Sequence, residues 1–206
     1  MSTSPALQGS LLDDGGQIGL APLAVRRTIL GQGAWLDVQH GWLTGADELF
    51  ALLANEVPWR GERRQMYDRT VDVPRLLAWY GEEDELPHPI LTEARAALTE
   101  HYEHEPFRTA GLCYYRDGRD SVAWHGDRIG RGATEDTMVA ILSIGAPRPL
   151  LLRPRGGGHT IRTAAGHGAL LVMGGSCQRT WEHAVPKTAK PVGPRISIQF
   201  RLRGVR

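Results

Sequence analysis

The residue types best suited to bind a metal ion occur in Trp124-His125-Gly126-Asp127, at the end of a run with β-type alternation. Because side chains alternate along a strand, His125 and Asp127 point to the same side of the chain. The best candidate for a third ligand is His183, 56 residues after Asp127 and between two β-type runs. Two imidazoles and one carboxylate suit Fe(II) and leave positions for a chelating cosubstrate and dioxygen. His-x-Asp alone is common in surface loops, so the prediction depends on residues further along the chain.

A strand with a polar face begins twelve residues after His183. Alternation places Arg195, Ser197, Gln199 and Arg201 on one face and Ile196, Ile198 and Phe200 on the other. Two guanidinium groups inside a barrel are costly unless anions neutralise them. A dicarboxylate such as 2-oxoglutarate would supply one anion, because arginine holds a carboxylate through two hydrogen bonds. The alternative is an edge strand with a solvated basic face, and the metal motif favours the cosubstrate.

Two helices and a series of short strands would position these residues. Apolar spacing predicts one helix that is capped by Thr44 and ends near Pro58, and a second helix over 90–102. A strand-like stretch covers 35–43, and the other β-type runs are 111–115, 121–124, 137–144, 150–152, 159–162, 168–173 and 195–202. Closely spaced strands after two helices predict a mainly β fold, a double-sheet barrel with helices on one side.

The remaining segments suggest a simple domain organisation. Residues 1–30 mix Ser, Pro and Gly without a sustained period, which predicts a poorly ordered leader before a single domain at 31–206. Residues 58–89 fit neither helix nor strand and are rich in aromatic residues and arginine. Such a long loop is usually functional, so we expect a lid over the site.

Composition limits the classes of function. The chain has 206 residues, 41% of them apolar, which is enough for one buried core. Its two cysteines, Cys113 and Cys177, are too few for a disulfide framework, so we expect a reducing, cytoplasmic setting. We also expect a monomer. No apolar stretch approaches the roughly 20 residues that span a bilayer, which argues against a membrane partner. Residues 106–206 carry 16 basic and 6 acidic residues, so nucleic acid is an allowed partner that charge alone does not establish.

Five segments together resemble the AlkB-type Fe(II)- and 2-oxoglutarate-dependent dioxygenases, from about Pro58 to Arg203. They are Pro74-Arg-Leu-Leu-Ala-Trp-Tyr-Gly81, Tyr115-Arg-Asp-Gly-Arg-Asp-Ser-Val-Ala-Trp-His-Gly-Asp127, Gly168-Ala-Leu-Leu-Val-Met173, Trp181-Glu-His-Ala-Val-Pro186 and Pro194 to Arg201. The resemblance implies a double-stranded β-helix (jelly roll) and oxidative demethylation of alkylated bases in DNA or RNA repair. The base would be single-stranded or flipped out of a duplex.

The resemblance also assigns roles to residues of this chain. His125, Asp127 and His183 match the iron ligands, and Tyr115 matches a tyrosine that contacts the cosubstrate. Arg195 and Arg201 match the two arginines of the closing strand. One of this pair binds a 2-oxoglutarate carboxylate in the family and the other supports the catalytic centre and the flipped base, and the sequence does not separate the two roles.

Some positions depart from the family pattern. Cys113 stands where an Asn is usual, and Ser197 and Gln199 replace an Asn and a Thr, so cosubstrate binding would be weaker but retained. Ile129 replaces an acidic residue that is common in members that demethylate DNA. Ile129 therefore favours an alternative, hydroxylation of a small molecule or a protein side chain. A non-catalytic barrel that binds nucleic acid is the alternative from another class.

Five residues are candidates for contact with the substrate. They are Tyr67, Arg75, Tyr80, Trp124 and Ile129. Tyr67 and Tyr80 would offer an aromatic face to the unstacked base. Trp79, next to Tyr80, is expected to be a core anchor.

Overall fold

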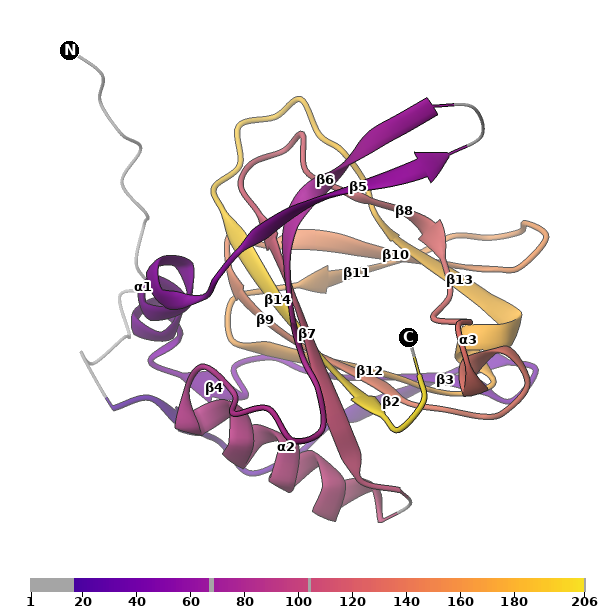
Figure 1. Ribbon diagram of the computed structural model, residues 1–206. Helices are drawn as coiled ribbons and strands as arrows, with labels where there is room; N and C mark the ends of the chain where they lie inside the picture. The colour runs from indigo at the N-terminus through magenta and orange to yellow at the C-terminus, as the bar shows by residue number, and fades with distance from the viewer. Residues whose placement is uncertain (1–16, 67–68, 104, 206) are drawn as a thin grey trace.

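The computed structural model describes residues 17–66, 69–103 and 105–205, and it describes side chains outside residues 63–72. Two antiparallel sheets form the body of this described part (Figure 1). The order of the larger sheet is β2 (Arg26–Gly31), β3 (Ala34–Gln39), β12 (Ala169–Gly175), β9 (Val139–Gly145), β14 (Arg195–Leu202), β7 (Phe107–Tyr115), β6 (Arg69–Tyr80) and β5 (Arg60–Met66). The order of the smaller sheet is β11 (Ile161–Ala165), β10 (Arg148–Pro154), β13 (Trp181–Val185) and β8 (Val122–His125). Residues of both sheets line one cavity, so the predicted mainly β, double-sheet barrel is confirmed.

Strand β14 lies between β9 and β7 in the larger sheet and follows the predicted alternation. Ile196, Ile198 and Phe200 have no exposed surface and pack in the apolar core, while the polar residues of the same strand line the cavity. Burial of one apolar face stabilises the pairing register, because a slip of one residue would exchange the two faces. The register therefore decides which side chains can reach the site.

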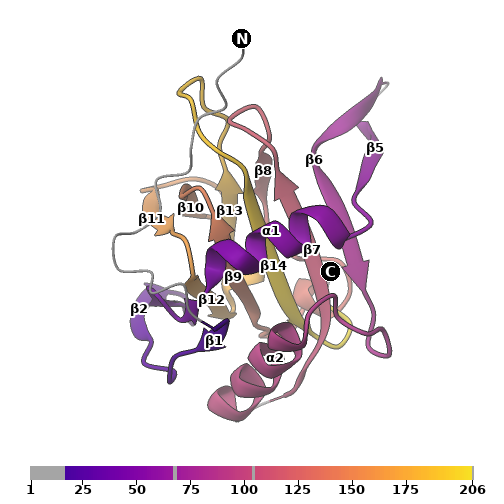
Figure 2. The same cartoon turned by 90° about the vertical axis from the view of Figure 1, so that its left-hand side faces the viewer.

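Two helices cover the outer face of the larger sheet, as the sequence predicts (Figure 2). Helix α1 (Ala46–Glu56) packs on β9 and β14, and helix α2 (Pro89–Tyr102) packs on β7. The predicted cap at Thr44 is wrong. Gly45 is the N-cap of α1, in a left-handed conformation with φ 62°, and the Thr44 hydroxyl donates instead to the carbonyl of Gly19 at 3.2 Å. Pairing of β4 (Leu43–Thr44) with β1 (Gly19–Leu20) draws that hydroxyl away from the helix.

The boundary of the predicted leader at residue 30 is wrong. Strands β1 and β2 lie inside it, and β2 pairs with β3 along the edge of the larger sheet. Arg27 donates two hydrogen bonds of 2.8 Å to the buried Asp37 carboxylate and stacks on the Trp35 ring at 3.8 Å. Most of β2 is exposed, so it lacks the apolar periodicity that would have predicted a strand. Residues 1–16 lie outside the described part of the chain.

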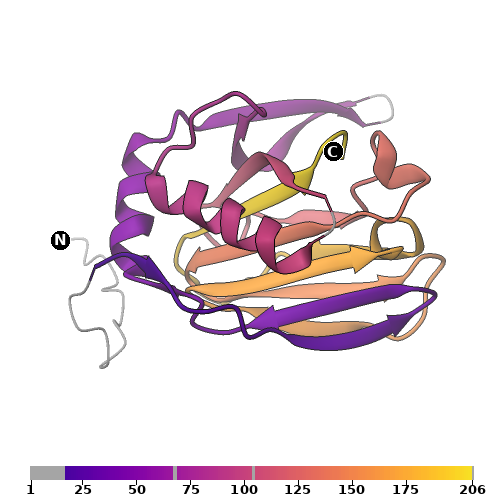
Figure 3. The ribbon, with the colours of Figure 1, turned by 90° about the horizontal axis from the view of Figure 1, so that it is seen from below.

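The predicted long loop over 58–89 is also wrong, because β5 and β6 form a hairpin there. Strand β5 reads Arg-Gly-Glu-Arg-Arg-Gln-Met and has no apolar alternation, so pairing with β6 determines its structure. Strand β6 in turn pairs with β7. Figure 3 shows this hairpin and the β2–β3 pair at opposite edges of the larger sheet. No helix in the described ranges is long and apolar enough to cross a membrane.

Candidate metal and cosubstrate site

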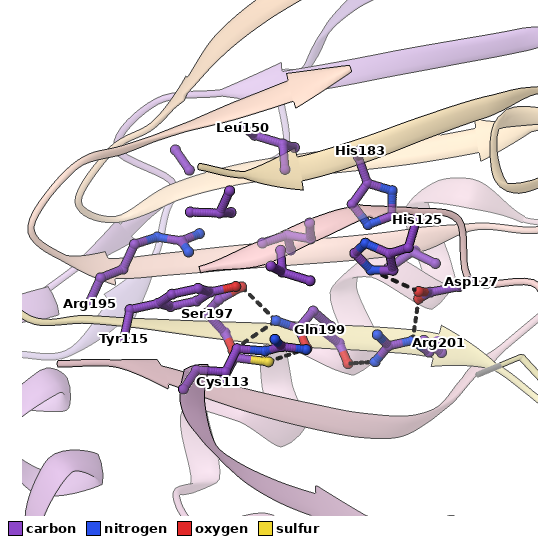
Figure 4. Close-up of a pocket in the computed structure, with 16 residues that line it drawn as sticks. Cys113, Tyr115, His125, Asp127, Leu150, His183, Arg195, Ser197, Gln199 and Arg201 are labelled. Carbon is purple, nitrogen blue, oxygen red and sulfur yellow. Dashed lines mark hydrogen bonds and ion pairs between the residues drawn. The ribbon is translucent and has the colours of Figure 1, made fainter. Parts of the chain in front are cut away.

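The three predicted metal ligands converge at one end of the cavity (Figure 4). His125 is the last residue of β8 and lies opposite His183 on β13, with the two ring centroids 4.2 Å apart. Asp127 follows two residues after His125, and its Oδ1 is 3.6 Å from His125 Nε2. One ligand atom from each residue lies within 4.8 Å of the others. This set of two imidazoles and one carboxylate fits Fe(II) and leaves part of its coordination sphere free.

Hydrogen bonds orient two of these ligands. His125 Nδ1 lies 2.9 Å from the carbonyl oxygen of Ala123, so the ring turns Nε2 toward the metal position. The amide of Asp127 donates to Gln178 Oε1 at 2.8 Å, and Arg201 Nε donates to Asp127 Oδ2 at 2.7 Å. Gln178 belongs to the short helix α3 (Cys177–Thr180). The carboxylate is therefore held from two sides before any ion binds.

Charge and burial set the protonation states of the ligands. Burial and then the nearby His125 lower the pKa of His183 to about 3. Burial raises the pKa of Asp127, but the opposing effect of Arg201, His183 and His125 is larger and holds it at about 2. At neutral pH the site thus presents a neutral imidazole and a carboxylate, the forms that ligate metals.

The other end of the cavity fits a carboxylate. Arg195 is 2% exposed, and its Nε donates to Ser143 Oγ at 2.8 Å. Its Nη1 is buried without a hydrogen-bond partner, and its guanidinium lies 5.2 Å from the centre of the Tyr115 ring. Burial lowers the pKa of Arg195, since a desolvated cation is destabilised. An anion at Nη1 would neutralise that charge, and one carboxylate of 2-oxoglutarate has the required chemistry.

The structure distinguishes the two arginines of β14, which the sequence leaves equivalent. Arg201 is bound to Asp127, whereas Arg195 is deep in the cavity with an unpartnered nitrogen. Arg195 is therefore the candidate for the remote carboxylate of the cosubstrate. Arg201 positions Asp127, a candidate metal ligand.

The residues that depart from the family pattern form one hydrogen-bonded chain between the two arginines. Cys113 Sγ donates to Gln199 Oε1 at 3.6 Å, and Gln199 Nε2 donates to Ser197 Oγ at 2.6 Å. All three side chains line the cavity. The three residues that differ from the family pattern therefore satisfy one another's hydrogen bonds, and this wall of the cavity stays polar.

The candidate substrate residues are dispersed. Arg75 lines the cavity, and its Nε is buried without a partner. Tyr80 is half-buried and packs against the apolar core, because it follows Trp79 on β6 and alternation turns it to the helical side of the sheet. Tyr67 lies outside the described residues. Tyr80 therefore cannot offer its ring to a group at the metal.

Trp124 and Ile129 lie outside the cavity wall. Trp124 precedes His125 on β8 and so points to the outer face of the smaller sheet, where the Arg153 guanidinium lies 4.2 Å from its ring. Ile129 is 70% exposed, two residues after Asp127. The expectation that Trp79 is a core anchor is wrong, since this side chain is 44% exposed.

Two further residues of the site were not recognised in the sequence. Ser143 holds Arg195, and Gln178 holds the amide of Asp127. Neither residue stands in a pattern that indicates a role, because each meets its partner through non-local pairing. Strand β13 was likewise missed, although it carries His183.

Comparisons with known proteins agree with this geometry. The family model described as the 2OG-Fe(II) oxygenase superfamily matches residues 51–201. The alpha-ketoglutarate-dependent dioxygenase alkB homolog 3 of Homo sapiens is 32% identical over 211 residues, which cover 90% of this chain and 69% of that protein. The DNA oxidative demethylase ALKBH2 of Arabidopsis thaliana is 27% identical over 228 residues, covering 86% of this chain and 69% of that protein. A solved prolyl hydroxylase from Trichoplax adhaerens has a TM-score of 0.57 at 12% identity, over 81% of this chain and 83% of that chain, and supports the fold alone.

Proposed function

Because the chain belongs to the 2OG-Fe(II) oxygenase superfamily and is an AlkB-like dioxygenase, we propose that it removes alkyl groups from nucleic-acid bases by oxidation. The observation that carries the proposal is one cavity with a metal triad at one end and the unpartnered Nη1 of Arg195 at the other. The name of one relative, the DNA oxidative demethylase ALKBH2, supports a nucleic acid as the substrate.

The metal and the cosubstrate would be bound by different residues, at opposite ends of the cavity. His125, Asp127 and His183 would hold Fe(II), and Arg195 would hold the remote carboxylate of 2-oxoglutarate. Fe(II) and 2-oxoglutarate held there would supply the oxidation of a C–H bond, with dioxygen consumed and with succinate and carbon dioxide released. Arg201 keeps the Asp127 carboxylate ionised and oriented.

Positioning of the alkyl group is the remaining task of the protein. Hydroxylation of an N-methyl group yields an N-hydroxymethyl group, which breaks down to formaldehyde and the unmodified base. The base must leave its stack to reach the metal end, so we propose a single-stranded or flipped substrate. Arg201 lines the cavity beside the candidate ligand Asp127, so it borders the metal end that such a base would have to reach.

The direct test is incubation with Fe(II), 2-oxoglutarate, dioxygen and a single-stranded oligonucleotide that contains an N-methylated adenine. We expect formaldehyde together with at least an equal amount of succinate, and no formaldehyde from an unmethylated oligonucleotide of the same sequence, which is the control. Succinate without formaldehyde would refute base demethylation. Absence of succinate under every condition would refute the assignment of dioxygenase activity.

The identity of residue 129 tests substrate choice within the same chemistry. Ile129 is exposed two residues after the candidate ligand Asp127, and an acidic side chain at this position would be able to face a base. We expect Ile129→Asp to change the relative rates on oligonucleotides with methylated adenine and methylated cytosine. Unchanged selectivity would mean that this position does not read the base. The alternative substrates, a small molecule or a protein side chain, would then remain in competition with a nucleic-acid base.

We also propose that the protein acts as a cytoplasmic monomer. Both cysteines are free and buried, which suits a reducing compartment. Light scattering of the purified chain and fractionation of cells that express it would test the two parts separately. A dimer in solution, or recovery outside the cytoplasm, would contradict them.

A further inference from the structure

One exposed apolar side chain, Trp79, lies beside the Arg201–Asp127 pair. In the part of the chain that the structure describes, the exposed large apolar residues are Ile29, Trp79 and Ile129, at 72%, 44% and 70% exposure. The Trp79 ring centre lies 5.9 Å from the Arg201 guanidinium carbon, and Ile129 follows Asp127 by two residues. An exposed aromatic ring next to a polar site offers a flat apolar face to a ligand.

Trp79 lies on the cavity side of the larger sheet. It pairs with Gly111 on β7, and Gly111 pairs with Gln199 on β14. Cys113, two residues after Gly111, lines the cavity, so alternation places Trp79 and Gly111 on that same face. Tyr80 points the opposite way, which removes it as the aromatic partner of a substrate.

Gly111 makes room for the indole. A Cβ at this position would lie 2.9 Å from Arg201 Nη1 and 3.4 Å from Trp79 Cε3. Trp79 and Arg201 can therefore approach each other over Gly111, which has no side chain to separate them. Trp79 lies over Gly111 at the rim of the cavity, beside the arginine that holds Asp127.

From this placement we infer that Trp79 is the surface against which the planar base of the substrate stacks. The inference rests on the proposed function, because it assigns the contact that orients the alkylated base. A half-exposed indole offers a flat apolar face, and stacking on it replaces part of the stacking that the base loses. The aromatic ring in the cavity wall, Tyr115, is 3% exposed and lies at the Arg195 end.

The kinetic test compares Trp79→Leu, which removes the aromatic face, with Trp79→Phe, which retains one. For Trp79→Leu we expect the KM for the methylated oligonucleotide to rise by about fivefold to a hundredfold. Trp79→Phe should stay within about threefold of the native value. Ile29→Ala, at an exposed residue on the edge strand β2, is the matched control and should leave KM unchanged.

The same variants separate stacking from support of the metal site. Succinate formed without oligonucleotide depends on Fe(II) and 2-oxoglutarate alone, so Trp79→Leu should reduce oligonucleotide turnover by more than it reduces that rate. An equal loss of this rate and of oligonucleotide turnover would show that Trp79 acts through Arg201, and it would overturn the inference. An unchanged KM in Trp79→Leu would also overturn it.

A binding measurement keeps the inference testable if base demethylation fails. The probe is N-methylated adenosine monophosphate, added to the Fe(II)- and 2-oxoglutarate-loaded protein without dioxygen, with ribose 5-phosphate as the ring-free control. We expect the nucleotide to quench tryptophan fluorescence in the native protein and in Trp59→Phe, but not in Trp79→Phe. Trp59 packs on Tyr114 and donates to the Leu53 carbonyl, away from the cavity. Equal quenching in Trp79→Phe, or none in the native protein, would refute stacking on Trp79.

Discussion

Asp127 and Arg201 form the central ion pair of the site. Arg201 Nε donates to Asp127 Oδ2 at 2.7 Å, and both side chains are largely buried. A buried pair of this kind is retained only where its geometry is good, and removal of one partner leaves an uncompensated charge. Here the arrangement leaves Asp127 Oδ1 toward His125 and the metal position.

Removal of the carboxylate should abolish the reaction. Asp127→Ala deletes the anionic ligand of the triad and leaves both imidazoles, so we expect Fe(II)-dependent succinate formation to disappear. Glu48→Ala, at an exposed position of α1, is the control and should keep the native rate. Persistent Fe(II)-dependent turnover in Asp127→Ala would mean that the assigned triad is wrong.

Arg195 offers a second test at the residue scale. Charge-assisted hydrogen bonds contribute about 1.5–3 kcal/mol each, so Arg195→Met should raise the KM for 2-oxoglutarate by roughly tenfold to a hundredfold or more. Fe(II) affinity, measured by equilibrium dialysis, should change little, because Arg195 does not contact the triad. Arg203→Met removes an exposed arginine paired with Glu82 and should leave both constants unchanged. If Arg195→Met keeps the native KM for 2-oxoglutarate, Arg195 does not bind the carboxylate of the cosubstrate.

The elements that carry the ligands are short and depend on one another. Strand β8 has four residues, and its pairing with β13 sets His125 opposite His183. Helix α3 holds the segment after β8 through Gln178. A displacement of this helix would move Asp127 without changing any ligand.

Gly126 provides a way to test that dependence. A Cβ at Gly126 would lie 2.4 Å from the carbonyl oxygen of Gln178, so Gly126→Ala must separate β8 from α3. We expect Fe(II) affinity to fall by about tenfold or more, because displacing a supporting contact commonly costs a metal site about 10–100-fold. Gly166→Ala is the matched control, since its nearest atom lies at 4.0 Å. Equal Fe(II) affinity in the two variants would show that α3 does not position the site.

At the scale of the whole molecule, the closed core keeps several ionisable groups neutral. Burial raises the pKa of Tyr115 from 10.0 to about 12 and that of Cys177 from 9.0 to about 12. The unfolded chain therefore releases these protons at lower pH than the folded chain does. The stability that these groups contribute is complete below about pH 9 and is lost as the pH rises through about 12.

This linkage predicts the response to alkali. The free energy of unfolding, from urea titrations at about pH 8 and about pH 11, should be smaller at the higher pH. Tyr115→Phe removes one of the groups and should make the decrease smaller. An identical decrease in the native protein and in Tyr115→Phe would show that Tyr115 does not contribute to it.

Local patterns were enough to predict much of this protein. Neighbouring residues determine three of its features: the spacing of His125 and Asp127, the alternation of 195–201 and the apolar faces of the two helices. The structure contains all three. The fold class followed from the order of helices and strands. Such features are visible in a sequence because each secondary structure imposes its own short period.

Tertiary structure alone decided the rest. It placed β13 beside β8, gave Arg195 and Arg201 different partners, paired the charged strand β5 with β6, and put Trp79 rather than Tyr80 on the cavity side. Each of these depends on which strands pair and in which register. Residues distant in the sequence determine that choice, because a strand such as β5 has no apolar face of its own and takes its structure from its neighbour.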